Sequence, residues 1–525
     1  MENINNLTSE NIKVDSFTND SIGNAGNLEA VSINDRYVVR KEYLILLMGT
    51  LLLGILSNIL FFDSELGVSV PIFVIAFYSV LFLSFGNTLK FKASLPWALS
   101  IPVILLSFTY MFYSNMIFYV LNLMAIPLLI VVQTVLITGN NIFSWHTPCF
   151  LIDIIYGFFF RVFVFVIKPF KITACIFTKK GKSSGKRTIR KVLLGLLISV
   201  PLLFIVVSLL ISADRIFESY MDRIPDMFAG IKVGEYIARG FIIIFIFVTS
   251  FSFIFSLAER KKPVTSIQGD GSIKLPKVWD SVVVMTIMIL VNAIYLMFVI
   301  IQFAYLFGGV RLALPEDFTF SEYARRGFFE LITVTIINFG MMMLFIGFTK
   351  LNGGAAGKFL RGLYSLLVGN TVIMLISAYY RMLLYEEAYG FTYLRVLSQS
   401  FMIFMLVIFG IMLFRIWKDG ISLAKPFIIT ALAAFVIINY VNIDVIIARE
   451  NIQRYYERDE IDVAYLSALS YDALPEIARL KVTNNKIVAE DAAALIKSKS
   501  EKALKNNDWQ SFNLSRYKAG RARWQ

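Results

Sequence analysis

The stretch Ser377–Arg395, SAYYRMLLYEEAYGFTYLR, joins two long apolar segments and concentrates charge where they meet. Apolar segments of about 20 residues are long enough to cross the roughly 30 Å hydrocarbon core of a bilayer. The stretch is therefore predicted to be a turn between two transmembrane helices. In this turn Gly390 ends the first helix and Thr392 caps the second. The charged residues of the stretch are Arg381, Glu386, Glu387 and Arg395.

The composition of the whole chain agrees with a membrane protein. Of its 525 residues 57% are hydrophobic and 17% are charged, whereas a soluble domain carries about 25% charged residues. Apolar runs of spanning length recur along the chain, so the predicted fold class is an all-α polytopic transmembrane helix bundle with about 11 spans. Two cysteines and the single His146 make no recognisable zinc site, and no cofactor is expected.

The order of polar and apolar segments divides the chain into five parts. Residues 1–42 are polar without apolar periodicity and are expected to be a disordered cytoplasmic tail. A four-span unit (43–138) and a basic cytoplasmic loop (139–191) follow, then a seven-span unit (192–446) and a helical tail (447–525). The predicted spans are 43–62, 67–85, 95–113, 116–138, 192–212, 237–257, 281–306, 328–349, 363–384, 394–414 and 426–446.

Within the basic loop, residues 151–167 are apolar enough to form a further span. Polar residues nevertheless recur along one edge at helical spacing, which favours a helix lying in the membrane interface with this edge toward headgroups and water. A true span is the alternative, and it would invert the orientation of everything that follows. The residues of this edge are Asp153, Gly157, Arg161 and Lys168.

The distribution of basic residues predicts the orientation. With the amino terminus inside, the internal segments carry 27 Lys or Arg and the short external loops carry six. Cytoplasmic loops are enriched in Lys and Arg, so this orientation is strongly favoured. The net charge of +13 is explained in the same way, without a nucleic-acid partner. The amino terminus is then cytoplasmic and the 79-residue tail 447–525 extracytoplasmic.

The tail is expected to fold into three or four short helices, because its apolar residues recur at helical spacing between Asp, Pro and Asn. The first of them is expected to continue the last span through Ile452 and Tyr455. So few residues make a marginal core of their own. The tail is therefore expected to pack on the membrane domain or on a protein partner, and the lipid bilayer is the other partner of the chain.

Several runs in residues 280–520 together resemble a family of multi-pass bacterial membrane proteins described as domain of unknown function 4173. The resemblance implies a bacterial cell membrane and this architecture, but no catalytic residues. A proline is expected after Asn442, where this chain has Ile443. The runs that carry the resemblance are 318–330, 381–395, 442–444, 447–452, 461–466, 469–475 and 509–516.

Arg381 is the leading candidate for a functional residue inside the membrane. If its helix runs to Gly390, the residue lies about 13 Å below the outer end at 1.5 Å per residue. An isolated guanidinium is costly there, so a partner on another helix is expected, and Glu330 is the candidate. The alternative is that Arg381 extends its guanidinium to the outer headgroups. Further candidates near the same outer end are Arg326, Tyr385 and Glu386.

No paired-histidine metal motif and no serine elbow is present in the sequence, so no catalytic residue is predicted. Three functions stay open. The favoured one is a non-catalytic membrane component that senses or scaffolds, with the tail as its interaction surface. The alternatives are a solute transporter that uses an intramembrane Arg/Glu pair, and a membrane enzyme that acts on a lipid-linked substrate.

Overall fold

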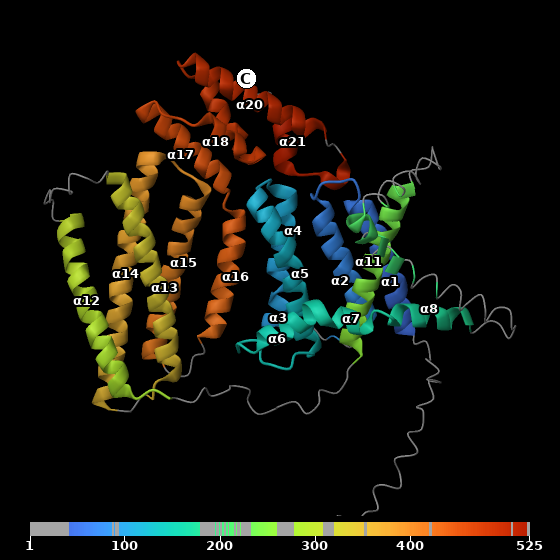
Figure 1. The fold of residues 1–525 in the computed structure, drawn as a ribbon, viewed down its shortest axis with the longest axis horizontal. Coiled ribbons are helices and arrows are strands. Elements are labelled where there is room, and N and C mark those ends of the chain that lie inside the picture. The colour runs from blue at the N-terminus through green and yellow to red at the C-terminus, as the bar shows by residue number, and fades with distance from the viewer. Residues whose placement is uncertain are drawn as a thin grey trace, which may run out of the picture.

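The protein is an all-helical bundle in the computed structural model (Figure 1). The structure describes residues 41–86, 94–178, 233–259, 278–307, 320–350, 354–418, 423–505 and 508–521, with position 89 and scattered positions between 195 and 221. These residues form α-helices with short 3₁₀ and π turns. Their only β-type pairing is an isolated bridge between Trp279 and Thr349.

The first membrane half packs its helices around one apolar core. Buried side chains such as Leu53, Leu106 and Phe251 form this core. The helices are α1 (Lys41–Phe61), α2 (Ser69–Phe85), α3 (Leu95–Ala98), α4 (Ser100–Phe112), α5 (Met116–Thr138), α6 (Phe150–Ile155), the π turn η2 (Tyr156–Phe160), α7 (Arg161–Phe165), α8 (Lys168–Thr178) and α11 (Val233–Ala258).

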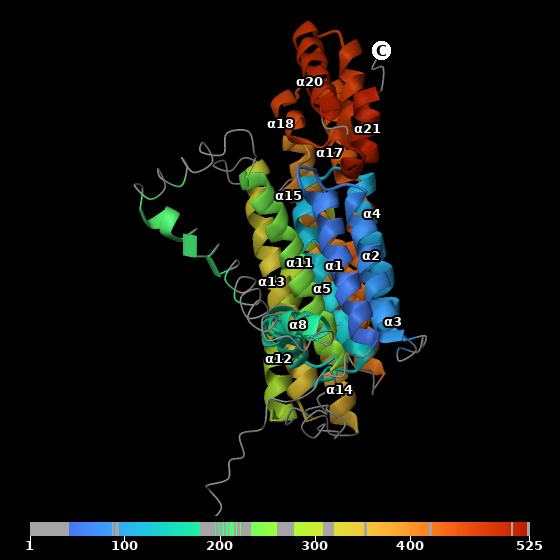
Figure 2. The ribbon, with the colours of Figure 1, turned by 90° about the vertical axis from the view of Figure 1, so that its right-hand side faces the viewer.

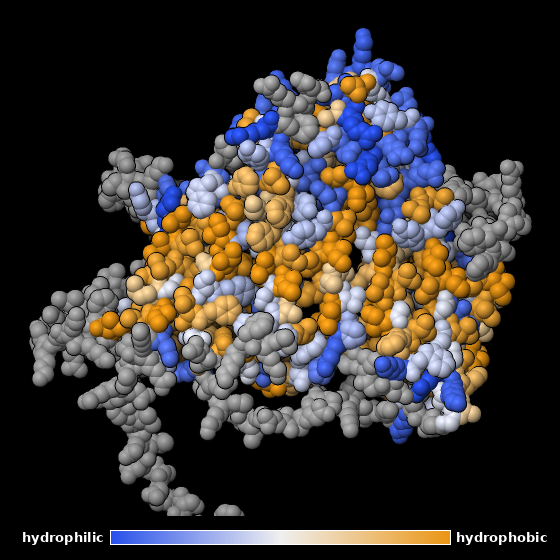
Figure 3. Space-filling model, turned by 180° about the vertical axis from the view of Figure 1, so that it is seen from behind, coloured by the Kyte–Doolittle hydropathy of each residue, from blue (hydrophilic) through white to orange (hydrophobic). Residues whose placement is uncertain are grey.

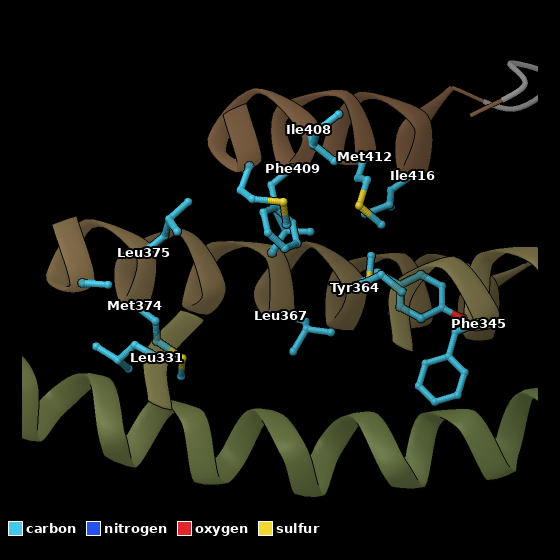
Figure 4. Packing of buried hydrophobic residues seen from close by; sticks show 14 of the residues in the cluster. Leu331, Phe345, Tyr364, Leu367, Met374, Leu375, Ile408, Phe409, Met412 and Ile416 are labelled. Carbon is cyan, nitrogen blue, oxygen red and sulfur yellow. The ribbon is translucent and has the colours of Figure 1, made fainter. Parts of the chain in front are cut away.

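The second membrane half has a separate core in which methionine is prominent. In Figure 4, Phe409 and Met412 of α15 point toward α14, and Leu367, a member of the same buried cluster, points from α14 to its opposite side. Unbranched methionine fills irregular gaps of this kind. The helices are α12 (Ser281–Phe307), α13 (Phe320–Phe348), α14 (Ala355–Tyr389) and α15 (Tyr393–Trp417).

Helix α16 (Ala424–Tyr440) lies between the two halves and bonds to the first (Figure 1). The Asn439 Oδ1 accepts a hydrogen bond of 2.7 Å from Asn122 Nδ2 in α5. The Tyr440 hydroxyl donates to the Leu105 carbonyl oxygen at 2.8 Å. Polar pairs of this kind hold helices together in lipid, where apolar contacts alone favour no particular neighbour.

The tail forms a compact helical cap at one end of the bundle, opposite the end where α1 begins (Figures 1 and 2). Its core of buried apolar residues includes Phe118 of α5 and Val396 of α15, so the tail folds onto the membrane helices. Its elements are α17 (Ile443–Arg458), α18 (Val463–Ala468), η4 (Tyr471–Ala473), α19 (Leu474–Ile477), η5 (Ala478–Val482), α20 (Lys486–Lys505), η6 (Trp509–Ser511) and α21 (Leu514–Arg521).

The sequence predicted that the last span continues straight into the tail. In the structure it does not. The chain breaks after Tyr440, and α17 is bent by 57° from α16. Val441 is extended, and the side chain of Asn442 caps the new helix by accepting from the Val445 amide at 3.3 Å. An asparagine cap starts a helix afresh, which is why the predicted continuation is wrong.

The predicted class of fold is confirmed. Among the described residues, nine helices are long and apolar enough to cross a membrane, and α16 with α17 makes a tenth if that bent pair is one span. Helix α2 has 17 residues and is a shorter apolar helix. The span predicted at 192–212 lies largely outside the described residues.

The segment predicted to lie in the membrane interface, 151–167, is part of the helical run 150–174, which crosses the lower end of the bundle in Figure 1. It is also one of the nine helices of spanning length and composition. Its polar edge does not face headgroups. Asp153 is buried and accepts hydrogen bonds from the Ile142 and Phe143 amides, and Arg161 Nη2 donates to the Asn140 carbonyl oxygen at 2.7 Å.

The reason for this difference is the loop at the lower end of α5, whose backbone groups need partners. The polar edge turns inward to supply them. Phenylalanines of the opposite edge are exposed instead, as in Phe163 at 71%. The prediction that the polar edge faces headgroups and water was therefore wrong. The edge that faces outward is apolar, so lipid rather than water would contact it.

In the turn between α14 and α15, the predicted role of Gly390 is confirmed. Gly390 follows the last residue of α14 with a φ of +81°, and its amide donates to the Glu386 carbonyl oxygen at 2.7 Å. Thr392 occupies the N-cap position of α15, but its side chain makes no capping hydrogen bond. Glycine is required at this backbone conformation because a Cβ atom would be strained there.

Candidate functional site: the junction of the tail with the membrane helices

Asp444 is the most completely hydrogen-bonded buried charge among the residues that the structure describes. It lies in the first turn of α17 and is 1% exposed. Its Oδ2 accepts from Asn115 Nδ2 at 2.6 Å, and its Oδ1 accepts from the Ser470 amide at 2.9 Å and from the Tyr393 hydroxyl. The position near a helix N-terminus also favours a negative charge. Asp444 thus joins α5, α15 and the tail.

Asp472 makes a second carboxylate centre next to the first. Its Oδ2 accepts from the amide and the hydroxyl of Ser114, both at 2.8 Å, and from the Ser470 hydroxyl at 3.1 Å. Its Oδ1 accepts from the Ser515 hydroxyl. Ser114 belongs to the turn between α4 and α5, and Ser515 to α21. Ser470 is the shared neighbour that bonds both aspartates.

Helix α21 and the turn before it fasten the tail to the first membrane half. Asn513 Nδ2 donates to the carbonyl oxygens of Tyr110 and Tyr113, at 2.8 and 2.7 Å. These carbonyls end α4 and would otherwise lack partners. The Val68 amide donates to the Phe512 carbonyl oxygen at 2.9 Å, which joins the α1–α2 turn to the tail.

Gly67 in the α1–α2 turn is required by this close approach. A Cβ atom at Gly67 would lie 2.6 Å from the Phe512 carbonyl oxygen. Next to it, Arg516 forms an ion pair with Glu65. The tail therefore bonds to both turns at the upper end of the first half.

Helix α17 fastens the tail to the second half at the Gly390 turn. The side-chain amide of Asn451 pairs with the backbone of Phe391 in both directions, each hydrogen bond at 2.8 Å. Arg454 donates to the carbonyl oxygens of Glu387 and Ala388, at 3.0 and 2.7 Å, which satisfies the exposed end of α14. The stretch that joins α14 and α15 is thus the surface on which the tail rests.

Lys499 of α20 adds a half-buried cation to the junction. Its Nζ donates to the Leu469 carbonyl oxygen. Burial lowers the pKa of Lys499, and the negative charge of Asp444 acts in the opposite direction. Burial likewise raises the pKa of the Tyr465 hydroxyl, which accepts a hydrogen bond from the Tyr393 amide at 3.1 Å. The junction is therefore a desolvated polar cluster.

Such a cluster is suited to holding segments together. Each oxygen of the two aspartates accepts at least one hydrogen bond from a donor of this chain. A hydrogen bond to a charged group contributes about 1.5–3 kcal/mol, and a broken one leaves a buried group unsatisfied. Among the described residues, no three of His, Cys, Asp and Glu are grouped so as to hold a metal ion.

Arg381, the leading sequence candidate, is buried between α14 and α12. It is 6% exposed, and its Nη2 donates to Gln302 Oε1 at 3.1 Å. The Ser377 hydroxyl donates to the same oxygen at 3.0 Å. A guanidinium extended to the outer headgroups does not fit this burial. Glu330 lies exposed on α13, and its pairing with Arg381 stays a prediction.

The other candidates separate in space. Glu386 is fully buried, its Oε2 accepts from Gln399 Nε2, and its Oε1 has no hydrogen-bond partner among the described residues. Tyr385 lies at the edge of the turn, with the Arg395 guanidinium 4.2 Å from its ring centroid. The side chain of Arg326 lies outside the described residues.

Sequence reasoning missed Asp444 and Asp472 as site residues, along with Asn115. The signal for the two aspartates was present, because both lie in the runs that carry the family resemblance. What those runs share is their place in space: 442–444, 469–475 and 509–516 all meet at the junction.

Comparison with known proteins gives one family match. The model of the family described as Domain of unknown function (DUF4153) matches residues 100–480. No curated protein and no solved structure matches the chain significantly. The family number 4173 expected from the sequence runs was therefore wrong, while the expectation of a domain of unknown function was right. The match covers well over half of the 525 residues, and the chain belongs to the family described as Domain of unknown function (DUF4153).

Proposed function

We propose that this multi-pass membrane protein is a non-catalytic component that senses or scaffolds, with the helical tail as its interaction surface. The observation that carries the proposal is the junction, in which Asp444 and Asp472 tie one tail to both membrane halves. A partner that binds the tail would thereby act on both halves at once. Because both carboxylates are occupied by donors of the chain, they favour a structural role over acid–base chemistry.

The outward side of the tail offers a surface for a protein partner. Val482 and Ile487, on either side of the turn from η5 to α20, are 82% and 72% exposed. Their neighbour Val488 packs on the tail core, so the exposed pair is held on a folded base. A contiguous exposed apolar patch outside the membrane is typical of a contact site. Figure 3 shows the hydrophilic tail above the hydrophobic band of the bundle.

The charge distribution supports a tail on the extracytoplasmic side of a bacterial cell membrane. The helix ends that lie opposite the tail in Figure 1 carry basic residues, as is typical of cytoplasmic ends. They are Lys168, Lys171, Lys350, Lys358, Arg361, Arg415, Lys418 and Lys425.

Position-specific photocrosslinking in intact cells tests the interaction surface. A photoreactive residue at Ile487 should give a discrete adduct, and the same residue at the exposed position Glu501 should not. The adduct should disappear when Val482→Lys is added, because a lysine there introduces charge into the apolar contact. Equal labelling from both positions, or no adduct from either, would contradict the proposal. A solute that stabilises the purified protein without any adduct would favour the transporter instead.

Cysteine labelling tests the orientation separately. With Cys149 and Cys175 replaced by serine, Lys505→Cys in the exposed end of α20 should react with an impermeant thiol reagent on intact cells. Reaction only after lysis would place the tail inside. That result would overturn the proposed orientation, whatever the tail binds.

A further inference from the structure

Glu386 is a buried carboxylate at the point where α14 meets the tail. It lies in the last turn of α14 and is fully buried. The residues that follow it bond directly to α17. Arg454 donates to the carbonyl oxygens of Glu387 and Ala388. Arg458 forms an ion pair of 2.5 Å with the Glu387 carboxylate. In Figure 1, α17 lies at the upper ends of α14 and α15, so a change of charge at Glu386 acts beside the surface on which the tail rests.

The Glu386 carboxylate has few hydrogen bonds for a buried charge. Its Oε2 accepts from Gln399 Nε2 of α15, and its Oε1 has no hydrogen-bond partner among the described residues. The carboxyl end of a helix is the negative end of its dipole, which disfavours a further negative charge in the last turn of α14. A buried carboxylate that is ionised and incompletely paired is costly, and the uptake of a proton removes this cost.

Charged groups of α15 and α17 act on Glu386 in opposite directions. The positive charge of Arg395 in α15 attracts the carboxylate. The Arg395 Nη1, however, donates to the carbonyl oxygens of Tyr389 and Gly390. The negative charge of Glu450 in α17 repels the carboxylate. Ionised Glu386 therefore acts against a like charge on the helix that begins the tail, and protonated Glu386 does not.

We propose that Glu386 is a proton-binding site through which the external pH controls how firmly the tail rests on α14 and α15. At low pH the carboxyl is neutral, its repulsion with Glu450 is absent and α17 packs firmly. As the pH rises, the carboxylate ionises and the contact loosens. The stabilisation is thus present at low pH and is lost as the pH rises through the titration of Glu386.

This inference rests on the proposed function, because it names the proton as the signal that the tail senses. The titration itself requires only the contact between α14, α15 and α17, and no bound partner. It is therefore measured on the purified full chain alone.

Glu386→Gln is the variant that separates the two protonation states. Glutamine keeps an acceptor for Gln399 and has the shape of the neutral carboxyl, but it cannot ionise. Glu490→Gln is the matched control, because it makes the same change at an exposed position of α20. All variants must elute as the same monodisperse species as wild type.

Hydrogen–deuterium exchange measures how often α17 opens. Peptides from residues 443–458 are compared between proteins at one pH, so the pH dependence of the exchange chemistry cancels. At about pH 8, α17 should exchange about threefold faster in wild type than in Glu386→Gln, and at about pH 5 the two should exchange alike. Glu490→Gln should match wild type at both pH values.

Glu450→Gln tests the repulsion without a change at Glu386. It should slow the exchange of α17 about twofold at about pH 8, where Glu386 is ionised, and leave it unchanged at about pH 5. An equal effect of Glu450→Gln at both pH values would show that the charge it removes does not act through Glu386, and would overturn the proposed mechanism.

Two results with Glu386→Gln would overturn the proposal. Exchange that matches wild type at both pH values would show that ionisation of Glu386 does not act on the tail. A difference of the same size at both would show that Glu386 binds no proton between them. Neither result bears on the crosslink at Ile487. If the pH-dependent difference is found and the crosslink is absent, the proposed interaction surface fails and the proton-binding site stands.

Discussion

The carboxylates at the junction and the carboxylate of Glu386 in α14 differ in how completely they are hydrogen-bonded. At the junction, Asp444 and Asp472 are surrounded by hydroxyl, amide and backbone donors from distant segments. In α14, Glu386 has one bonded oxygen and one buried oxygen without a partner among the described residues. The difference indicates that the junction carboxylates stabilise the tertiary structure. The buried Glu386 carboxylate instead lowers the stability of the fold, and other interactions offset this loss.

Removing a junction carboxylate should have the largest effect. Asp444→Ala leaves the Asn115 amide, the Tyr393 hydroxyl and the Ser470 amide buried without their acceptor. We expect a loss of about 3 kcal/mol or more in the free energy of unfolding. Thermal unfolding of the purified protein measures it. Asp491→Ala, at an exposed position in α20, is the control and should change little. Equal melting temperatures for the two variants would show that Asp444 does not stabilise the junction.

The turn beneath the tail should be the next most sensitive place. Gly390 has a φ of +81°, and a Cβ atom would lie 2.5 Å from Asn451 Oδ1. Gly390→Ala should therefore destabilise by about 1–3 kcal/mol through backbone strain and loss of the Asn451 hydrogen bonds. Gly410→Ala, in open space on α15, should be neutral or slightly stabilising. If the two alanines behave alike, the tail does not rest on this turn.

The buried cation of α14 should show coupling to its observed neighbour. A double-mutant cycle of Arg381→Ala with Gln302→Ala should give an interaction free energy of about 1 kcal/mol, because the two side chains are hydrogen-bonded at 3.1 Å. The same cycle with Glu330→Ala tests the pair predicted from the sequence. Coupling to Glu330 that exceeds coupling to Gln302 would restore that pair. Fully additive effects in both cycles would leave Arg381 without either partner energetically.

Replacing Glu386 by glutamine should change the free energy of unfolding least. The sign of this change should differ from that of the matching replacement of Asp444 by asparagine. Glu386→Gln removes a charge from the last turns of α14, where the helix dipole and burial both disfavour it, and keeps a possible acceptor for Gln399. We expect a stabilisation of about 0.5–1 kcal/mol. Asp444→Asn should instead destabilise, since an amide can no longer accept from all of the same donors. The same sign in both variants would erase the difference between the two sets of charges.

Hydropathy was sufficient to predict the architecture, because lipid allows few ways to satisfy a backbone. Local chemistry was also sufficient at Gly390, where only glycine suits the end of α14. The exit of the last span was missed because the Asn442 cap competes with helix continuation. The junction could not be predicted, since Ser114 and Asp472 are 358 residues apart and single-sequence patterns report only on near neighbours.

The inward turn of 150–174 was missed for a related reason. A polar edge of a helix predicts a polar environment, but not whether headgroups or the protein's own loops supply it. Here Asp153 and Arg161 bond to the loop that follows α5. In the same way, the sequence predicted a partner for Arg381, and an acidic residue was expected because it offsets the positive charge. The structure places the neutral Gln302 there.

The most direct test separates the two membrane halves by a cut. A protease site inserted between residues 260 and 277 divides the chain after α11 and leaves the tail on the second fragment. After cleavage in detergent, the wild-type fragments should remain together on size exclusion, because the tail bonds both halves. Fragments of the Asp444→Ala, Asp472→Ala double variant should dissociate at a clearly lower denaturant concentration, since only the contacts of α16 and of residues 512–516 then join the two fragments. If the fragments of the double variant stay together as firmly as those of wild type, the aspartates do not hold the two halves to one tail.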